Sequence, residues 1–195
     1  HSAATSADFA MRLGLRNIGL DPERDVSLRV VGATNLRMIT MQQGQAQFTV
    51  ISSTEREEAE KLGFKVLADL ASKKIPYPHS GLISSQKLLR EKRDTMLRFA
   101  RASVEAIHYF KNNKPHTIAI LKKYANTDVT TLDSAYAYLK NAIPDMPYPT
   151  LEGMKTILAE MGRTRPEVLK YEASSMVDIS IVKTIDEEGF LKKLK

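Results

Sequence analysis

An α/β fold is predicted by the sequence, with one βαβ lobe on a mainly parallel sheet and a helix-rich C-terminal half. Between Asp8 and Leu70, amphipathic helical patterns alternate with short apolar runs rich in β-branched residues. Strands that alternate with helices form βαβ units, and such units build parallel sheets. From Ser85 onward, nearly every periodic segment repeats its apolar residues with the spacing of a helix.

In the first half, helices and strands are expected in strict alternation. Phe9 and Leu13 lie on one stripe of the first helix, and Gly19 is its expected stop. Thr54 and Glu57 have the spacing of a capping box for the third helix. The expected order is a helix over Asp8–Asn17, a strand over Ser27–Gly32, a helix over Thr34–Gln43, a strand over Ala46–Ser52, a helix over Ser53–Leu62 and a strand over Phe64–Leu70.

The second half opens with one more short apolar run, Gly81–Ser85, and then reads as helices. Pro115 is placed to open one of them. The prolines of the stretch 144–150 mark a linker, with Tyr148 beside one of them. The expected helices are Leu88–Lys111, one that begins near Pro115, Thr131–Leu139, Leu151–Met161 and two short pieces within Asp178–Leu194 that meet at Gly189.

The composition is typical of a globular protein with one domain or two small lobes. The chain has 195 residues, of which 43% are hydrophobic and 27% charged. It has no cysteine, which excludes disulfides and thiolate chemistry, and no apolar run near the roughly 20 residues that span a bilayer. The four histidines lack metal-ligand spacing, and no nucleophile elbow or P-loop is present. We therefore expect no enzyme, no metal and no cofactor.

Polar residues stand at the junctions where the first three helices begin. A helix N-terminus carries unpaired N–H groups and a partial positive charge, so it can bind an anion. The alternative is an ordinary N-cap, with Thr5 capping the first helix over Asp8 and Thr34 capping the second. The candidate ligand-binding residues at these junctions are Ser2, Thr5, Ser6, Thr34, Asn35, Ser52 and Ser53. In a parallel sheet all three junctions would follow one rim.

Six stretches, in this order, resemble a family of ABC-transporter substrate-binding proteins, the group that binds sulfonates, nitrate and thiamine precursors. They are HSAATSADFAMRLGLRNIGLDPERDV, MQQGQAQFTV, AEKLGFKVLADLASKKIPYPHSGLI, REKRDTMLRFARASVEAIHYFK, YPTLEGMKTIL and VDISIVKTIDEEGF. The resemblance implies a periplasmic-binding-protein-like fold of type II, with two α/β lobes around a ligand cleft. Residues 1–79 would be the second-lobe α/β domain, and residues 80–195 a crossover strand and helices that complete the first lobe. The opening of the first lobe would then lie before residue 1.

The resemblance also implies a function. The chain would capture a small anionic or polar organic solute, such as a sulfonate, nitrate or a pyrimidine, between its lobes. His79, in the crossing segment, would face that cleft, and Tyr77 beside it would pack at the hinge or against the ligand. The expected partners are the solute and a membrane permease, at a periplasmic or extracellular, membrane-associated location. Self-association is expected if the first lobe is absent.

Three other functions stay open at this stage. The first is the effector-binding domain of a transcription regulator with the same architecture. The second is an enzyme on the same fold, similar to pyrimidine-forming thiamine enzymes. The third is a basic interaction module, because the net charge is +6 and basic residues are densest over Gln86–Arg101. A solvated helix face is the favoured explanation of that stretch, and no nucleic-acid partner is expected.

Overall fold

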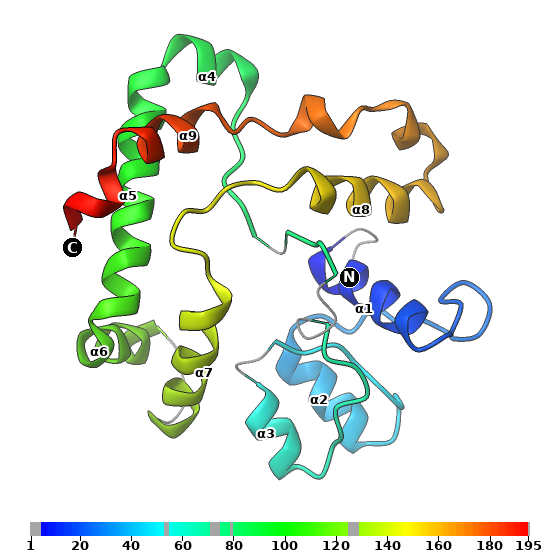
Figure 1. Ribbon diagram of the computed structural model, residues 1–195. Helices are drawn as coiled ribbons and strands as arrows, with labels where there is room; N and C mark the ends of the chain where they lie inside the picture. Colours follow the sequence, from blue (N-terminus) through cyan, green and yellow to red (C-terminus); the bar gives the residue numbers. More distant parts are fainter. Residues whose placement is uncertain (1–4, 53–54, 71–74, 79, 125–128, 195) are drawn as a thin grey trace. The chain divides into compact units, whose positions relative to one another are not determined.

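Helices are the regular elements of this protein. The structure, a computed structural model, describes residues 5–52, 55–70, 75–78, 80–124 and 129–194. Figure 1 shows the helices along the chain. They are α1 (Ser6–Asn17), α2 (Thr34–Gln42), α3 (Arg56–Lys61), α4 (Gln86–Glu91), α5 (Arg93–Asn112), α6 (Lys114–Tyr124), α7 (Val129–Ala142), α8 (Leu151–Gly162), η1 (Pro166–Lys170), η2 (Ala173–Met176), α9 (Ser180–Glu187) and η3 (Phe190–Leu194), where η marks a 3-10 helix.

The residues that the structure describes form no parallel sheet, and the predicted α/β fold class is wrong. No strand is present in the described ranges, and the four runs expected to be strands, 27–32, 46–52, 64–70 and 81–85, lie outside the helices as irregular chain. Some of their apolar side chains are exposed, with Val30 67%, Leu67 69% and Ile83 98% accessible, and others, such as Phe48 and Ile51, are half-buried. A β-branched run becomes a strand only where a neighbouring strand and a buried face receive it. The described part of the chain provides no partner strand.

The helix predictions are confirmed with small differences in their bounds. The first helix begins at Ser6 and ends at Asn17, and Gly19 follows it with φ 85°. Gly189, with φ 65°, separates α9 from η3 as expected. The helix expected over Leu88–Lys111 is divided into α4 and α5 at Lys92, whose φ of −128° and ψ of 38° are not helical. A positive φ favours glycine because it has no Cβ, so glycine stops are predictable.

The chain forms two compact units. Unit 1 comprises residues 1–77 and 156–170, and unit 2 comprises 78–155 and 171–195. The chain therefore passes between the units three times, and one of these passages falls within α8. The sequence-based division into 1–79 and 80–195 assumed an α/β lobe, and it stays a prediction.

Unit 1 is built around α1. Phe9 and Leu15 of α1 are buried, as are Met38 of α2 and Ala59 of α3. The ring of Phe9 stacks on that of Tyr77, with the ring centroids 4.9 Å apart and the planes inclined by 11°. This aromatic pair joins the start of the unit to the end of its first segment.

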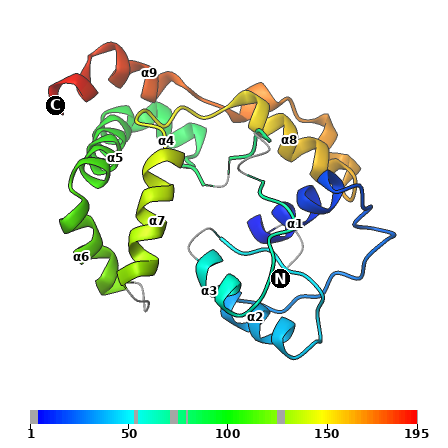
Figure 2. The same cartoon turned by 60° about the horizontal axis from the view of Figure 1, so that its bottom comes forward.

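Unit 2 has its core between α5, α9 and η3, which lie side by side in both views (Figures 1 and 2). Val104 of α5 and Ile185 of α9 are fully buried, at 0% exposed. A second contact lies between α5 and α7, where the rings of Phe110 and Tyr136 are 5.2 Å apart and the Tyr136 hydroxyl donates to the Lys111 carbonyl at 2.9 Å. Amphipathic helices thus bury apolar stripes against one another without a sheet.

Candidate functional site

The first turn of α1 is the first of the three predicted junctions. Thr5 is the N-cap, in an extended conformation with φ −80° and ψ 160°, and its hydroxyl accepts a hydrogen bond from the Asp8 N–H at 3.2 Å. The Tyr77 hydroxyl donates to the Ser6 carbonyl at 3.4 Å, and burial raises the pKa of that hydroxyl. The cap and the Phe9–Tyr77 stack together hold this turn in one position.

The two N–H groups at the start of the capped turn have no acceptor within the helix, as is general for the first N–H groups of an α-helix. The Asp8 N–H is bound by Thr5 and the Phe9 N–H by the Thr5 carbonyl at 2.9 Å. The N–H groups of Ser6 and Ala7 precede both of these, and the Ser6 side chain is exposed. Thr5 therefore serves as a cap, and Ser6 is the predicted site residue that faces solvent at this helix end.

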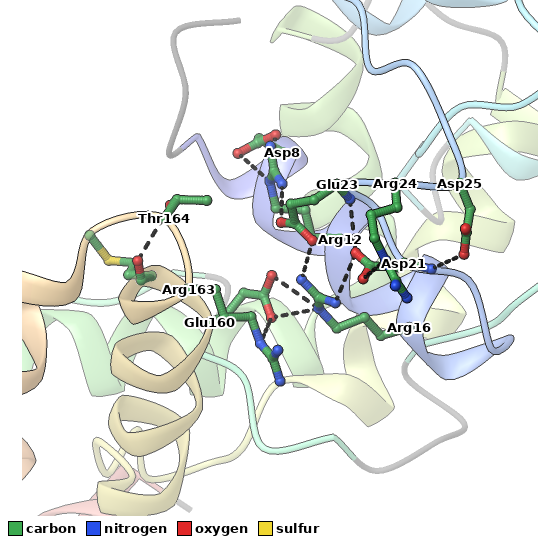
Figure 3. A network of polar contacts seen from close by, with 11 residues as sticks. Asp8, Arg12, Arg16, Asp21, Glu23, Arg24, Asp25, Glu160, Arg163 and Thr164 are labelled. Carbon is green, nitrogen blue, oxygen red and sulfur yellow. Dashed lines mark hydrogen bonds and ion pairs between the residues drawn. The ribbon is translucent and has the colours of Figure 1, made fainter.

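An ion-pair network covers the side of α1 (Figure 3). Arg16 reaches Glu23 at 2.6 Å and Glu160 at 3.1 Å, and Arg12 reaches Glu23 at 2.8 Å and Asp8 at 3.2 Å. Glu160 is 6% exposed and also pairs with Arg163 at 3.4 Å. In all, four arginines balance four carboxylates: Arg12, Arg16, Arg24 and Arg163 against Asp8, Asp21, Glu23 and Glu160.

This network determines the electrostatics beside the α1 N-terminus. Burial lowers the pKa of Arg16, but its hydrogen bonds to Glu23 and Glu160 outweigh burial and raise it. The backbone N–H of Glu23 donates to Asp21 and is the main cause that lowers the pKa of Asp21 to about 2. Both groups therefore stay charged at neutral pH. Since the charges balance, attraction of an anion here depends on the backbone N–H groups and the helix dipole.

The second predicted junction is arranged differently from the expectation. The N-cap of α2 is Ala33, without a side-chain cap, and Thr34 is the first helical residue. The Thr34 hydroxyl accepts a hydrogen bond from the Arg37 guanidinium at 2.6 Å, and Asn35 is exposed. Burial lowers the pKa of Arg37, against an opposing effect of Glu55. The alternative interpretation of Thr34 as a simple N-cap is therefore wrong.

The third junction is closed by a carboxylate. The Ser52 N–H donates to the Glu55 carboxylate at 2.8 Å, and the Ser52 hydroxyl is bound to the same carboxylate. Glu55 is itself the N-cap of α3, again without a side-chain cap. The expected capping box began at Thr54, which lies outside the described residues. Ser52 is exposed, but its polar groups face a negative partner.

The rim on which the three junctions were expected to meet has no basis in this fold. That rim was argued from the ends of parallel strands, and the described residues contain none. Thr5, Thr34 and Ser52 each interact with the residue three positions later, so all three hydroxyls serve their own helix start. Ser2, Ser53 and His79 lie outside the described residues.

Sequence reasoning missed the polar network on α1. The spacing of Asp8 and Arg12, four apart on one helix, is the signal that could have revealed one of its pairs. The charged cluster after Gly19 could have revealed others. Nothing local pointed to Glu160, which is 144 residues from its partner Arg16.

The described part of the chain holds neither a metal-binding cluster nor a membrane-spanning helix. No group of three or more His, Asp or Glu side chains there is placed to hold a metal ion. None of the helices described is both long and apolar enough to cross a membrane. The geometry offers backbone donors at α1 and hydroxyl groups that cap or brace helices. Comparisons with protein-family models, curated proteins and solved structures found no match for this chain.

Proposed function

We propose that this chain is the non-enzymatic, solute-binding component of an ABC importer, and that it binds a small anionic or polar organic solute. The importer class is supported by the family resemblance of the six sequence stretches between His1 and Phe190. In this proposal the solute is a sulfonate, nitrate or a pyrimidine, and the loaded chain docks on a membrane permease at the periplasmic or extracellular side.

The observation that carries the ligand site is the pre-organised first turn of α1. Thr5 caps the turn and Phe9 stacks on Tyr77, so the N–H groups of Ser6 and Ala7 are held ready before a ligand arrives. A helix N-terminus carries about +0.5 elementary charge, which favours an anionic or strongly polar group. Pre-organisation reduces the entropy that binding would otherwise cost. The Ser6 hydroxyl adds one exposed donor.

The distribution of charge on the chain favours a small ligand that carries little charge. The chain carries +6 overall, so its field attracts anions from solution. Next to the turn, however, Asp8 is paired with Arg12 and the arginines of the network are all matched by carboxylates. A singly charged oxoanion or a neutral polar ring therefore suits this site better than a multiply charged phosphate.

Substitution of Ser6 tests this site without removing the cap. Ser6→Pro deletes the N–H group and the hydroxyl, whereas Ser6→Ala deletes the hydroxyl alone. Proline is favoured at the first helical position, and the extended conformation of Thr5 is the one required before proline. We expect calorimetry with methanesulfonate, nitrate and an aminopyrimidine to find one solute that binds. Ser6→Pro should lower the affinity for that solute about tenfold, which is the effect of one charge-assisted hydrogen bond.

Ser6→Ala should lower the affinity for the same solute less than Ser6→Pro does. Thermal unfolding of both variants serves as the control, because Ser6→Pro should not lower the melting temperature. The ligand site would be refuted if the proline variant bound that solute as tightly as the parent chain. If the parent chain bound none of the three solutes, the proposed function itself would fail.

A further inference from the structure

Helix α5 is apolar on two opposite sides. Its inner side carries Ala100 and Val104, which are 6% and 0% exposed in the core with α9. Its outer side carries Phe99 and Tyr109, which are 55% and 41% exposed, and the ring and hydroxyl of Tyr109 also contact His116 of α6. A surface helix normally buries one apolar stripe and turns a polar face to water. The outer side of α5 departs from that pattern.

The exposed apolar residues of this side follow a regular spacing, which also takes in Thr95. Thr95, Phe99, Ala102, Ala106 and Tyr109 are separated by four, three, four and three residues, and all five are exposed. This is the spacing of the a and d positions of a coiled coil, at which one helix packs against another. Two alanines at its centre allow a second helix to approach closely. We call these five residues the outer seam of α5.

Charges flank the outer seam along one edge. Arg98 and Glu105 are both exposed and seven residues apart, so each directly precedes a seam residue, Phe99 or Ala106. Arg98 pairs with Asp94 at 3.2 Å, and both of these side chains are highly exposed. Glu105 forms no ion pair with any residue that the structure describes. The edge therefore carries one positive and one negative charge at equivalent positions.

We propose that the outer seam docks on the outer seam of a second copy of this chain, with the two α5 helices antiparallel. When Phe99 lies over Ala102 of the partner subunit, Ala106 lies over Thr95 of the partner subunit. In the same register Arg98 faces Glu105 of the partner subunit, and twofold symmetry repeats the pair. The surface is thus self-complementary in shape and in charge, as a twofold interface requires.

The charges select this orientation. In a parallel pair, coiled-coil geometry places Arg98 and Glu105 opposite Ser103 and Phe110 of the partner subunit, so neither charge meets its opposite. Only the antiparallel pair places both Arg98 and Glu105 opposite a charge of the other sign. The proposal concerns α5 in unit 2 and does not depend on the ligand site of α1.

Charge reversal tests the pairing directly. Arg98→Glu and Glu105→Arg each place like charges opposite one another twice, whereas the double variant restores both pairs in reverse. We expect sedimentation velocity over a wide concentration range to show a reversible dimer of the parent chain. Each single variant should weaken it about tenfold, and the double variant should recover it. Lys87→Glu, an exposed charge reversal on α4, is the matched control and should leave it unchanged.

Cysteine cross-linking tests the orientation, since the chain has no cysteine of its own. A mixture of Thr95→Cys and Ala106→Cys chains should form disulfide-linked heterodimers, while Thr95→Cys alone should not cross-link. Circular dichroism confirms that each variant keeps its helices. A parent chain that stays monomeric, a double charge variant as weak as the single ones, or cross-linking of Thr95→Cys with itself would each overturn the proposal.

Discussion

Glu160 is the residue on which the polar network of α1 depends most. Its carboxylate is 6% exposed and lies 3.1 Å from Arg16 and 3.4 Å from Arg163. Glu160→Gln should lower the free energy of unfolding by about 1–3 kcal/mol, because two guanidinium groups lose a buried charged partner. The loss stays in that range since Arg16 keeps Glu23. Chemical denaturation measures it.

The matched control for Glu160 is Glu152, whose pair with Lys155 is exposed on the same helix. Glu152→Gln should change stability by no more than about 0.5 kcal/mol, as exposed pairs usually do. Equal effects of the two substitutions would mean that burial of Glu160 contributes nothing.

Single residues were predictable where their partners are close in sequence. Thr5 was recognised as a possible cap because Asp8 stands three residues on, and the structure pairs them. Thr34 also pairs three residues on, but with the Arg37 side chain instead of a backbone N–H group. Glu160 has a local partner in Arg163, three residues on, but that pair does not indicate its contact with Arg16 of α1. Sequence spacing thus indicates a local hydrogen bond far better than a pair that only the fold brings together.

At the scale of the element, two helical glycines should respond oppositely to alanine. A Cβ on Gly14 of α1 would meet only Leu70, at an ordinary 3.8 Å, so Gly14→Ala should stabilise the protein by about 0.5–1 kcal/mol through helix propensity. A Cβ on Gly153 of α8 would lie 2.6 Å from the rigid Pro78 ring and 2.5 Å from the Thr150 hydroxyl, which accepts the Gly153 N–H.

Overpacking at Gly153 therefore outweighs the gain in propensity. Gly153→Ala should lower stability by about 1–2 kcal/mol, since overpacking typically costs 1–3 kcal/mol. Differential scanning calorimetry of the two variants shows whether each substitution raises or lowers the stability. A Gly153→Ala protein that melts higher than the parent chain would show that Pro78 and Thr150 can move away at little cost.

Helices were predictable as elements and strands were not, for a physical reason. A helix satisfies its backbone groups within one segment, so a 3.6-residue periodicity and a terminal glycine describe it almost completely. The run 64–70 has the apolar content of a strand, yet Leu67 is 69% exposed and the run pairs with no strand in the described chain. A strand requires a neighbour that its own residues do not encode.

At the scale of the whole molecule, the two units have cores of unequal burial. Unit 2 has a cluster of buried apolar residues on α5 and α9, whereas the fully buried side chains of the described chain do not include any from unit 1. The three passages of the chain between the units mean that neither unit is one continuous segment. Stability should therefore differ between the units along one chain.

Hydrogen exchange should reveal that difference. The amides around Val104 and Ile185 should exchange most slowly, because both side chains are 0% exposed and their helices pack against each other. The amides of 46–52 and 64–70 should exchange far faster, since these runs belong to no helix and have no strand partner in the described chain. Mass spectrometry of peptides from a labelling time course compares them. If 46–52 and 64–70 were protected as strongly as α5, their backbone groups would have to be paired in a sheet, and the all-helical architecture would be wrong.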